Sequence, residues 1–513
     1  MTLFNSNFFR WHIKSNQKKL IKMIDQVDKE NSLPQKCVLA QKAASFAVNH
    51  TTDVFSSKII EKPFMDLAKS IKVPIDESYK KDTVLHVLTE AYNTGGHTRC
   101  VERWISLLSD KCHSCAVLRQ TVPFPESLRT ITEKNGGDIY FFDKNKKVVL
   151  NAISLRQLAS KFEYVVLHIH MDDPTALIAF GTEKFKRPIL FFNHADHAFW
   201  LGASISDCVA DLNSYRNSIT NKYRRVFYSK ILGIPLDKSI EHNVEKNLAR
   251  GKIGIPIEKK VIYSGGQVNK YLPIGYPSFE NIINDIIEME PNVLFIIAGV
   301  EKNKGFWKKL LIKFPNNLIL PGRLDYATEY PYYLGASDLV IDSWPVSGET
   351  AIIDAVNLGK PVLTLSVVMQ ADYLVNSLAA CKSYNELIEK SIHILNDNNF
   401  ARTIYEDVYN KQNKEIDPVI WKEKCCEILK DMPKQHKVYD IGELKLPLSI
   451  TRCSFETCRW TEPCFLSFSL KKLIKWFFFL DIRKKIFIFR FMGIYFIKIN
   501  RRKNELRAES YIL

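Results

Sequence analysis

Residues 339–365 read LVIDSWPVSGETAIIDAVNLGKPVLTL and have the clearest structural pattern in the sequence. It begins and ends with short apolar runs, LVIDS and PVLTL, which are typical of buried parallel strands. A loop with Pro345 and Gly348 leads from the first run into the helical segment 350–359, which ends at Gly359, a residue suited to a helix C-terminus. A strand, a helix and a second strand in this order predict a βαβ unit in a parallel sheet.

The same alternation of strand and helix patterns extends on both sides of this unit. From Thr83 onward, apolar runs of strand length are separated by helical stretches. Two successive α/β halves predict two Rossmann-like domains that face each other across a cleft, with ligands at the carboxyl ends of the strands. The other predicted strands are 83–88, 115–119, 138–142, 163–169, 188–193, 261–265, 293–299 and 317–322.

Changes in pattern and composition predict five segments along the chain. The first is helical, because apolar residues recur at spacings of three and four before Thr83. The region 203–254 is more polar and is expected to connect the two halves. The predicted segments are a helical N-terminal unit at 1–78, a first Rossmann-like domain at 79–254, a second Rossmann-like domain at 255–400, C-terminal helices and a linker at 401–464, and a basic amphipathic tail at 465–513.

The formal net charge of +16 does not indicate a nucleic-acid partner, because much of it lies at one end of the chain. Residues 465–513 contain twelve Lys or Arg and three Asp or Glu, a net charge of +9. Bulky apolar residues alternate with these cations, and the charges interrupt the segment too often for a membrane-spanning helix. Residues 465–503 are therefore expected to lie on an anionic membrane surface, and the alternative is an element packed on the body of the protein.

Cysteine usage and the first residues of the sequence indicate the compartment. The eleven cysteines are odd in number and scattered among apolar residues, which fits reduced thiols better than a disulfide framework. The stretch MTLFNSNFFRWHIKSNQKK contains no apolar segment typical of a secretory signal. We therefore expect a cytoplasmic protein, or one bound peripherally to the cytoplasmic face of the membrane.

One loop of the second half carries residues suited to a phosphate-bearing ligand. The helix that begins after Ser347 and Gly348 presents backbone N–H groups at its start, where phosphates bind, and Thr350 adds a hydroxyl. Asp354, one turn further on, is placed to accept hydrogen bonds from ribose hydroxyls. The alternative is an ordinary capped helix with a surface aspartate.

The loop after the predicted strand 261–265 is suited to the same ligand. Gly265 and Gly266 let the backbone approach a ligand closely, and Lys270 follows at a distance that lets it reach the same place. A lysine facing a diphosphate would neutralise the charge that develops as the diphosphate leaves. The alternative is a solvated surface lysine.

Read together, the two loops resemble a known family. The stretch 261–365 resembles the donor-binding half of GT-B-type glycosyltransferases, and most of all the protein O-N-acetylglucosaminyltransferases and the related bacterial protein glucosyltransferases. The resemblance lies in a Gln-x-x-Lys-x-x-Pro pattern followed by Gly-x-Thr, a helix aspartate and Gly-x-Pro. The matching residues are Gln267, Lys270, Pro273, Gly348, Thr350, Asp354, Gly359 and Pro361.

The resemblance implies a nucleotide diphosphate sugar as the donor, UDP-linked, with no cofactor and no metal. Lys270 and Thr350 would contact the β-phosphate, and Asp354 would contact the ribose. Tyr330 falls where the family places a base-contacting side chain, and a tyrosine could stack on uracil. The expected donor site comprises Gly265, Gly266, Gln267, Lys270, Tyr330, Ser347, Gly348, Glu349, Thr350 and Asp354.

Two residues of this region depart from the family pattern. Ala351 stands where the family often has a second threonine, and Glu349 replaces a more neutral residue. An acid beside phosphates is unfavourable unless it points away from them or binds a sugar hydroxyl.

A glycine-containing loop of the first half is a candidate for the acceptor or the donor sugar. It reads NTGGHTR and follows the first predicted strand of that half. Gly95 and Gly96 permit close approach to a ligand, and His97 or Arg99 could contact it. The alternative is a plain tight turn.

A second loop of the first half, within FFNHADHAFWLG, carries two candidate catalytic histidines. His194 or His197 is expected to be a general base that deprotonates an acceptor hydroxyl, as Lys270 is expected to assist the leaving group in the other half. The alternatives are a ligand for the donor phosphate, a zinc site with Asp196, and a structural pair of histidines beside Trp200.

Together these features predict a metal-independent glycosyltransferase, a hexosyltransferase. It would move a sugar from a nucleotide diphosphate sugar to a glycan, a lipid-linked saccharide or a protein, in cell-surface polysaccharide assembly. One alternative is a nucleotide-sugar epimerase on the same fold. Another is a non-catalytic protein that binds a membrane or a nucleic acid through the basic tail, which leaves Lys270, Thr350 and Asp354 unexplained.

Overall fold

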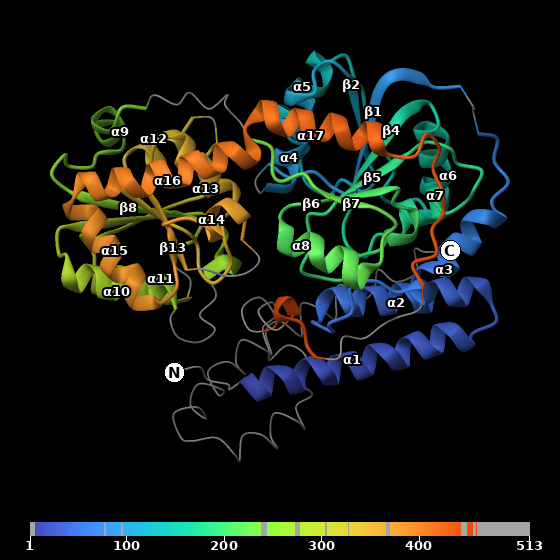
Figure 1. Ribbon diagram of the computed structural model, residues 1–513, viewed down its shortest axis with the longest axis horizontal. Coiled ribbons are helices and arrows are strands. Elements are labelled where there is room, and N and C mark those ends of the chain that lie inside the picture. The colour runs from blue at the N-terminus through green and yellow to red at the C-terminus, as the bar shows by residue number, and fades with distance from the viewer. Residues whose placement is uncertain are drawn as a thin grey trace. The chain divides into compact units, whose positions relative to one another are not determined.

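The chain folds into two compact α/β units, each built on its own parallel sheet (Figure 1). The computed structural model describes residues 6–75, 78–93, 96–236, 244–271, 278–302, 305–326, 328–365, 370–442, 449–454 and 458. The second unit comprises Leu212–Tyr215 and Leu232–Cys425. The first unit comprises Arg216–Ile231 and the described residues before Leu212 and after Cys425.

The first unit contains a seven-stranded sheet in the order β3-β2-β1-β4-β5-β6-β7, in which every pair of neighbours is parallel. The order reverses between β1 and β4, as in a doubly wound Rossmann-like sheet. Its strands are β1 (Lys80–Leu88), β2 (Cys112–Val117), β3 (Ile139–Phe141), β4 (Phe162–His168), β5 (Ile189–Phe192), β6 (Cys208–Asp211) and β7 (Ser229–Ile231). Its crossover helices are α4 (Gly96–Leu107), α5 (Glu126–Lys134), α6 (Val148–Ala159), α7 (Thr175–Phe180) and α8 (Ser214–Ile219), the last followed by the π-helix Thr220–Arg224.

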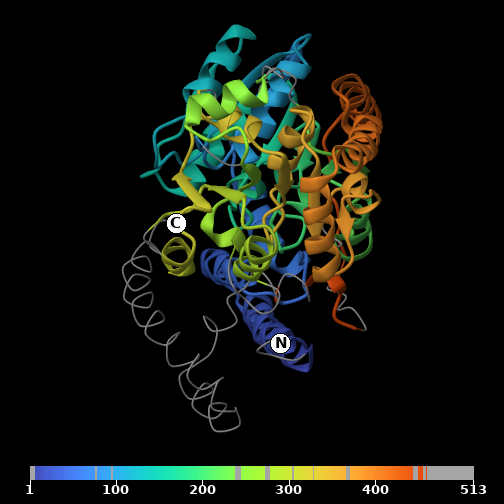
Figure 2. The same cartoon turned by 90° about the vertical axis from the view of Figure 1, so that its left-hand side faces the viewer.

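Three N-terminal helices belong to this first unit, and Figures 1 and 2 show α1 and α2 as long blue helices. Leu20, Ala44 and Phe64 from these helices lie in the same apolar core as Val165 and Phe191 of the sheet. The sequence predicted a separate helical unit at 1–78; the helices are present, but they share the core of the first sheet. The helices are α1 (Ser6–Lys29), α2 (Leu33–Asn49) and α3 (Lys58–Ser70).

A buried carboxylate ties these helices to the sheet domain. Glu61 of α3 accepts hydrogen bonds from the backbone N–H groups of Gly202, Ala203 and Ser204, at 2.7, 3.0 and 2.8 Å. Its side chain is fully buried, so these three donors satisfy an acceptor that would otherwise be costly to remove from water.

The second unit contains a six-stranded parallel sheet in the order β10-β9-β8-β11-β12-β13. Its strand order reverses between β8 and β11, so the loops after these two strands flank the switch point. The strands are β8 (Lys260–Gly265), β9 (Val293–Ala298), β10 (Leu318–Gly322), β11 (Leu339–Ile341), β12 (Val362–Leu365) and β13 (Ala380–Cys381). The helices are α9 (Lys246–Ile253), α10 (Phe279–Met289), α11 (Gly305–Lys313), α12 (Tyr330–Gly335), α13 (Thr350–Asn357), α14 (Asp372–Val375), α15 (Tyr384–Asn396), α16 (Asn398–Ile416) and α17 (Pro418–Asp431).

The boundaries between the units differ from those predicted. The connector expected at 203–254 instead supplies β6 and β7 to the first sheet, and the second unit resumes at Leu232 rather than at 255. The segment expected at 401–464 is also divided, because α17 begins in the second unit and the chain from Cys426 returns to the first. Strands as short as β7 carry too few apolar residues to stand out from a polar sequence.

The ten cysteines among the described residues form no disulfide. No helix in the described ranges is long and apolar enough to cross a membrane. The predicted basic tail, 465–513, lies outside the described residues.

Candidate functional site

The switch point of the second sheet brings together two loops that the sequence singled out. Lys270 lies in a short 3-10 helix, Val268–Tyr271, just after β8. Its Nζ donates a hydrogen bond of 2.8 Å to the carbonyl oxygen of Ser347, in the loop that leads from β11 to α13. The ammonium group therefore lies beside the residues that begin α13.

The start of α13 has backbone donors to offer a ligand. The amides of Glu349 and Ala351 donate within the loop, to Ser347 Oγ and to the carbonyl oxygen of Gly348. Within the described part of the chain, no hydrogen bond is made by the amides of Thr350 and Ile352. Free amides at a helix start, together with the helix dipole, favour an anion at this position.

Asp342, which the sequence analysis did not single out, holds this loop in place. Its Oδ1 accepts the Gly348 amide at 2.7 Å, and its Oδ2 accepts the Thr364 hydroxyl at 3.1 Å. The side chain is only 3% exposed, and burial raises its pKa. Because Asp342 is already engaged by the loop, its role is to shape the site.

The electrostatics of Lys270 favour an anionic ligand. Burial lowers the pKa of Lys270, although the nearby charges of Asp342 and Glu349 partly oppose this effect. A buried ammonium group is stabilised in its charged form by an anion placed next to it. A phosphate bound beside Lys270 would supply that charge.

The glycines of the two loops allow them to approach each other closely. A Cβ atom on Gly266 would lie 3.1 Å from Lys270 Cδ, and one on Gly348 would lie 3.3 Å from the carbonyl oxygen of Gly265. Each distance is tighter than an ordinary van der Waals contact. The sequence predicted that these glycines admit a ligand, and the structure shows that they also admit the neighbouring loop.

Gly299, at the end of β9, supports the same loop and provides a test of it. Its φ is 85°, and a Cβ atom there would lie 2.5 Å from the carbonyl oxygen of Gly266. We expect Gly299→Ala to lower the free energy of unfolding by about 1–2 kcal/mol for the left-handed backbone and by a further 1–3 kcal/mol, roughly, for the clash. Urea unfolding of the full chain measures both contributions.

Gly322, at the end of β10, is the matched control. Its φ is 82°, but a Cβ atom there would meet nothing within 4 Å, so Gly322→Ala reports the backbone cost alone. Equal losses of stability in the two variants would show that the loop after β8 does not depend on its contact with Gly299.

The residues expected around the nucleoside also come together. Asp354, in α13, is 2% exposed, and its Oδ2 accepts a hydrogen bond of 3.1 Å from the hydroxyl of Tyr326. The rings of Tyr326 and Tyr330 stack with centroids 5.2 Å apart. Tyr326 thus links Asp354 to Tyr330. In the sequence, nothing marks Tyr326 except that it is aromatic and stands four positions before Tyr330, in the loop after β10. The ribose and base contacts of Asp354 and Tyr330 stay predictions.

Three further predicted donor residues lie in the same loops. Gln267 is exposed, and its carbonyl oxygen accepts the Lys270 amide at 2.8 Å. The Thr350 hydroxyl lies 3.4 Å from the carbonyl oxygen of Gly348. Glu349 has a φ of 32°, which is unfavourable for a residue with a side chain and marks local strain at the start of α13.

In the first unit, His97 and His194 come together at the carboxyl edge of the sheet. Gly96 begins α4, and His97 follows it; Gly95 lies outside the described residues. The His97 and His194 rings have centroids 4.3 Å apart. His97 Nε2 donates to the carbonyl oxygen of His168 at 2.9 Å, while its Nδ1 is buried and has no partner among the described residues.

His194 is hydrogen-bonded to a row of buried histidines that the sequence analysis missed. Its Nε2 lies 3.0 Å from Nδ1 of His168, which is linked in turn to His86 and His113. All three lie inside apolar strands, so nothing in their local sequence separates them from ordinary core positions.

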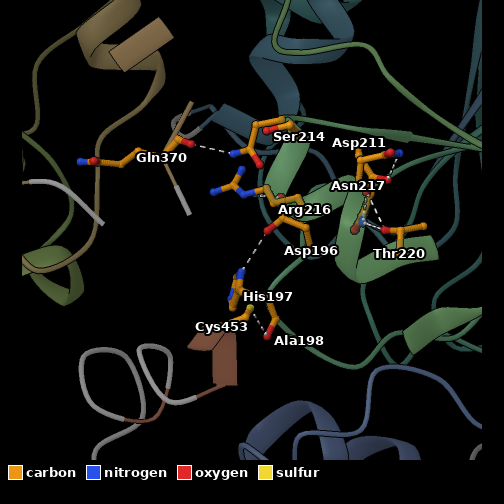
Figure 3. A network of polar contacts seen from close by, with 12 residues as sticks. Asp196, His197, Ala198, Asp211, Ser214, Arg216, Asn217, Thr220, Gln370 and Cys453 are labelled. Atoms are coloured by element: carbon orange, nitrogen blue, oxygen red, sulfur yellow. Dashed lines mark hydrogen bonds and ion pairs between the residues drawn. The ribbon is translucent and has the colours of Figure 1, made fainter. Parts of the chain in front are cut away.

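His197, the other candidate base, lies in a different network (Figure 3). Its Nδ1 is 3.5 Å from Oδ1 of Asp196, and Asp196 forms a buried ion pair of 2.7 Å with Arg216. His194 and His197 therefore do not form the pair that the sequence suggested. Among the described residues, no group of three or more His, Cys, Asp or Glu side chains has the arrangement of a metal site.

Comparisons with known proteins identify the fold. No protein-family model and no curated protein sequence matches the chain. Among solved structures, HepE of Anabaena in complex with UDP-glucose is 15% identical, with a TM-score of 0.54 over 68% of this chain and 100% of HepE. A glycosyltransferase from Rickettsia africae is 13% identical, with a TM-score of 0.53 over 69% of this chain and 99% of that protein.

A third solved structure is similar to the same degree. TarM is 10% identical, with a TM-score of 0.53 over 69% of this chain and 99% of TarM. These likenesses span nearly the whole of each known protein and about two thirds of this chain. The chain therefore has the GT-B fold of glycosyltransferases.

Proposed function

We propose that the protein is a glycosyltransferase that moves a sugar from a nucleotide diphosphate sugar to an acceptor hydroxyl. The main observation behind this proposal is that the Lys270 ammonium group lies at the start of α13, at the switch point of the second sheet, where it donates a hydrogen bond to Ser347. An ammonium group and free helix amides in one place suit a diphosphate. In GT-B folds this sheet is where we expect the donor.

Several observations support UDP as the nucleotide. The stacked tyrosines Tyr326 and Tyr330 offer an aromatic face for a base, and Asp354 lies beside them for a ribose. The HepE structure, which shares the fold, contains UDP-glucose. The resemblance of residues 261–365 to protein O-N-acetylglucosaminyltransferases points to the same nucleotide.

In the proposed reaction, an acceptor oxygen attacks the anomeric carbon of the donor sugar. The bond from that carbon to the diphosphate oxygen breaks, and the leaving diphosphate takes the bonding electrons. Lys270 and the amides of α13 stabilise the resulting negative charge without a metal. His194 accepts the proton of the acceptor hydroxyl as general base, so atoms and charge balance.

We propose a glycan, a lipid-linked saccharide or a protein as the acceptor, in the assembly of cell-surface polysaccharide. The support is the amphipathic sequence of residues 465–503, which suits the cytoplasmic face of an anionic membrane. On this proposal the enzyme is cytoplasmic and peripheral, with no nucleic-acid partner.

Nucleotide binding tests the donor site directly. In a thermal-shift panel of UDP, GDP, CDP and their sugars, we expect UDP or a UDP-sugar to stabilise the full-length protein. A nucleotide present at one hundred times its Kd adds about 2.7 kcal/mol to the free energy of unfolding. The shift should be largely lost in Lys270→Met, which keeps the length of the side chain and removes its charge.

Lys313→Met is the matched control, because Lys313 is an exposed lysine at the end of α11 in the same unit. It should keep the wild-type shift. If no nucleotide stabilises the protein, the glycosyltransferase proposal fails, and a non-catalytic binding protein becomes the better account.

A further inference from the structure

Four histidines on four neighbouring strands form one continuous chain of hydrogen bonds. We call this set the histidine chain: His113 at the start of β2, His86 in β1, His168 at the end of β4, and His194 just after β5. The strands are neighbours in the sheet in the order β2-β1-β4-β5. The chain therefore runs across the sheet to its carboxyl edge.

The register of the parallel strands explains why the rings meet. His113 pairs with Val84, and His86 lies two residues beyond Val84 on the same face. His86 pairs in turn with Val166, and His168 lies two residues beyond it. The pairing of β4 with β5 extends to Leu167 and Phe191, and its continuation by one residue leaves His194 two residues beyond the position opposite His168. Each ring therefore stands diagonally next to the previous one.

The contacts join opposite nitrogens of successive rings. His194 Nε2 lies 3.0 Å from His168 Nδ1, and His168 Nε2 lies 3.0 Å from His86 Nδ1. His86 Nε2 lies 2.9 Å from His113 Nδ1. At the inner end, His113 Nε2 lies 2.9 Å from the carbonyl oxygen of Leu108.

The carbonyl oxygen of Leu108 sets the direction in which every hydrogen bond of the histidine chain is donated. A carbonyl oxygen only accepts hydrogen bonds, so the Nε2 of His113 must carry a proton. In a neutral ring its Nδ1 is then an acceptor, which requires a proton on Nε2 of His86. The same step repeats at His168 and at His194. The last ring is left with a proton on Nε2 and a lone pair on Nδ1.

Burial keeps each ring neutral, so each ring carries a single proton. It lowers the pKa of His113 to about 4 and lowers the pKa values of His86, His168 and His194 well below the usual 6.5. The inner three rings are fully buried. Trp104 of α4 packs edge-on against the rings of His86 and His168, with centroids 5.7 and 5.9 Å away, and hinders their rotation.

We propose that His168, His86 and His113 are positioning residues that hold His194 in one tautomer. In this tautomer Nδ1 of His194 is unprotonated and directed away from the other three rings. The functional consequence rests on the proposed role of His194 as general base, since only an unprotonated nitrogen accepts a proton. His194 is partly exposed, and its Nδ1 has no hydrogen-bond partner among the described residues. The neighbouring His97 offers a buried Nδ1 instead, so His194 is the better placed base.

The tautomers can be observed without any substrate. In full-length protein labelled with ¹⁵N-histidine, two-bond N–H correlation spectra at pH 7.5 distinguish protonated from unprotonated ring nitrogens. We expect His86, His113, His168 and His194 each to carry a single proton, on Nε2. The protein has 12 histidines, and substitution of each member of the chain assigns its signals. A proton on Nδ1 of His194, or on both of its nitrogens, overturns the proposal.

Substitution of His113 tests the transmission along the chain. His113→Leu removes the acceptor for His86, so we expect His194 to populate both tautomers and kcat to fall on the order of tenfold, with the KM of the donor unchanged. His113→Asn keeps a side-chain oxygen where His86 donates, so it should restore both the single tautomer and kcat. If His113→Leu leaves the tautomer of His194 and kcat as in the wild type, the proposal is wrong.

His436 is the matched control, because it is a buried histidine of the same unit outside the histidine chain. Its ring bonds Asp207 and the carbonyl oxygen of Phe180. His436→Leu should lower stability yet leave the four tautomers unchanged. If the four rings carry the expected protons but no sugar transfer is found with any donor, the histidine chain stands and the proposed function fails.

Discussion

Replacing His194 by alanine lowers kcat of sugar transfer by a factor of about 10² to 10⁴, the usual contribution of a positioned general base. The thermal shift produced by UDP stays as in the wild type, because the proposed nucleotide contacts all come from the second unit. Steady-state kinetics and thermal shifts on the same preparations measure the two effects separately.

The same experiment decides between the roles considered for His194. A loss of the UDP-dependent shift in His194→Ala would mean that this histidine holds the donor phosphate. A loss of kcat in His197→Ala but not in His194→Ala would move the base to the network of Asp196 and Arg216.

The pH dependence follows from the partial burial of the His194 ring. Burial lowers its pKa well below 6.5, and the neighbouring His97 adds to the effect. The base is active when unprotonated, so kcat/KM should fall as the pH drops through this lowered pKa. The acid limb of the profile is therefore expected below pH 6.5, and an acid limb at or above pH 6.5 would contradict the assignment.

Replacing Lys270 by methionine lowers kcat by a factor of about 10² to 10³, as the loss of one charge-stabilising donor does elsewhere. The reason is that negative charge on the leaving diphosphate grows toward the transition state, where a buried ammonium group stabilises it most. Rates measured at a saturating concentration of the sugar donor separate this loss of kcat from any weaker binding of the donor.

The matched variant Lys313→Met should transfer sugar at the wild-type rate, since its side chain is exposed on α11. A donor with a better leaving group should suffer less from Lys270→Met, because less charge must be stabilised. If kcat is unchanged and only KM rises, Lys270 binds the donor equally in the ground state and the transition state.

Several features of the second unit could be predicted because they are local in the sequence. The apolar runs around Val261 and Val340 are strands, and the helix predicted from Thr350 begins there. The glycines and Lys270 follow a strand directly, so the carboxyl edge of a parallel sheet is the only place for them. The pairing of Lys270 with Ser347 then follows once β8 and β11 are neighbours.

Other features could not be predicted because they depend on distant parts of the chain. The sequence shows Asp342 only as the end of a strand. Its hydrogen bond with the Gly348 amide depends on how the loop after β11 folds. Tyr326 carried no motif, although it joins Asp354 to Tyr330. The helices expected at 1–78 are present, but the core that they share with the first sheet could not be predicted, because a helix pattern shows which face is buried and not what buries it.

The two α/β halves, most of their strands and helices, and the loops that carry Lys270 and His194 could be predicted from the sequence alone. These depend on periodicities of two and 3.6 residues and on glycines, which are read within a dozen positions. The alignment of His86, His113, His168 and His194 in one row is visible in the folded protein and not in the sequence. Two hydrogen-bonded histidines of this row, His86 and His168, are 82 residues apart in the sequence. The strand register that aligns them is set by the packing of the whole sheet.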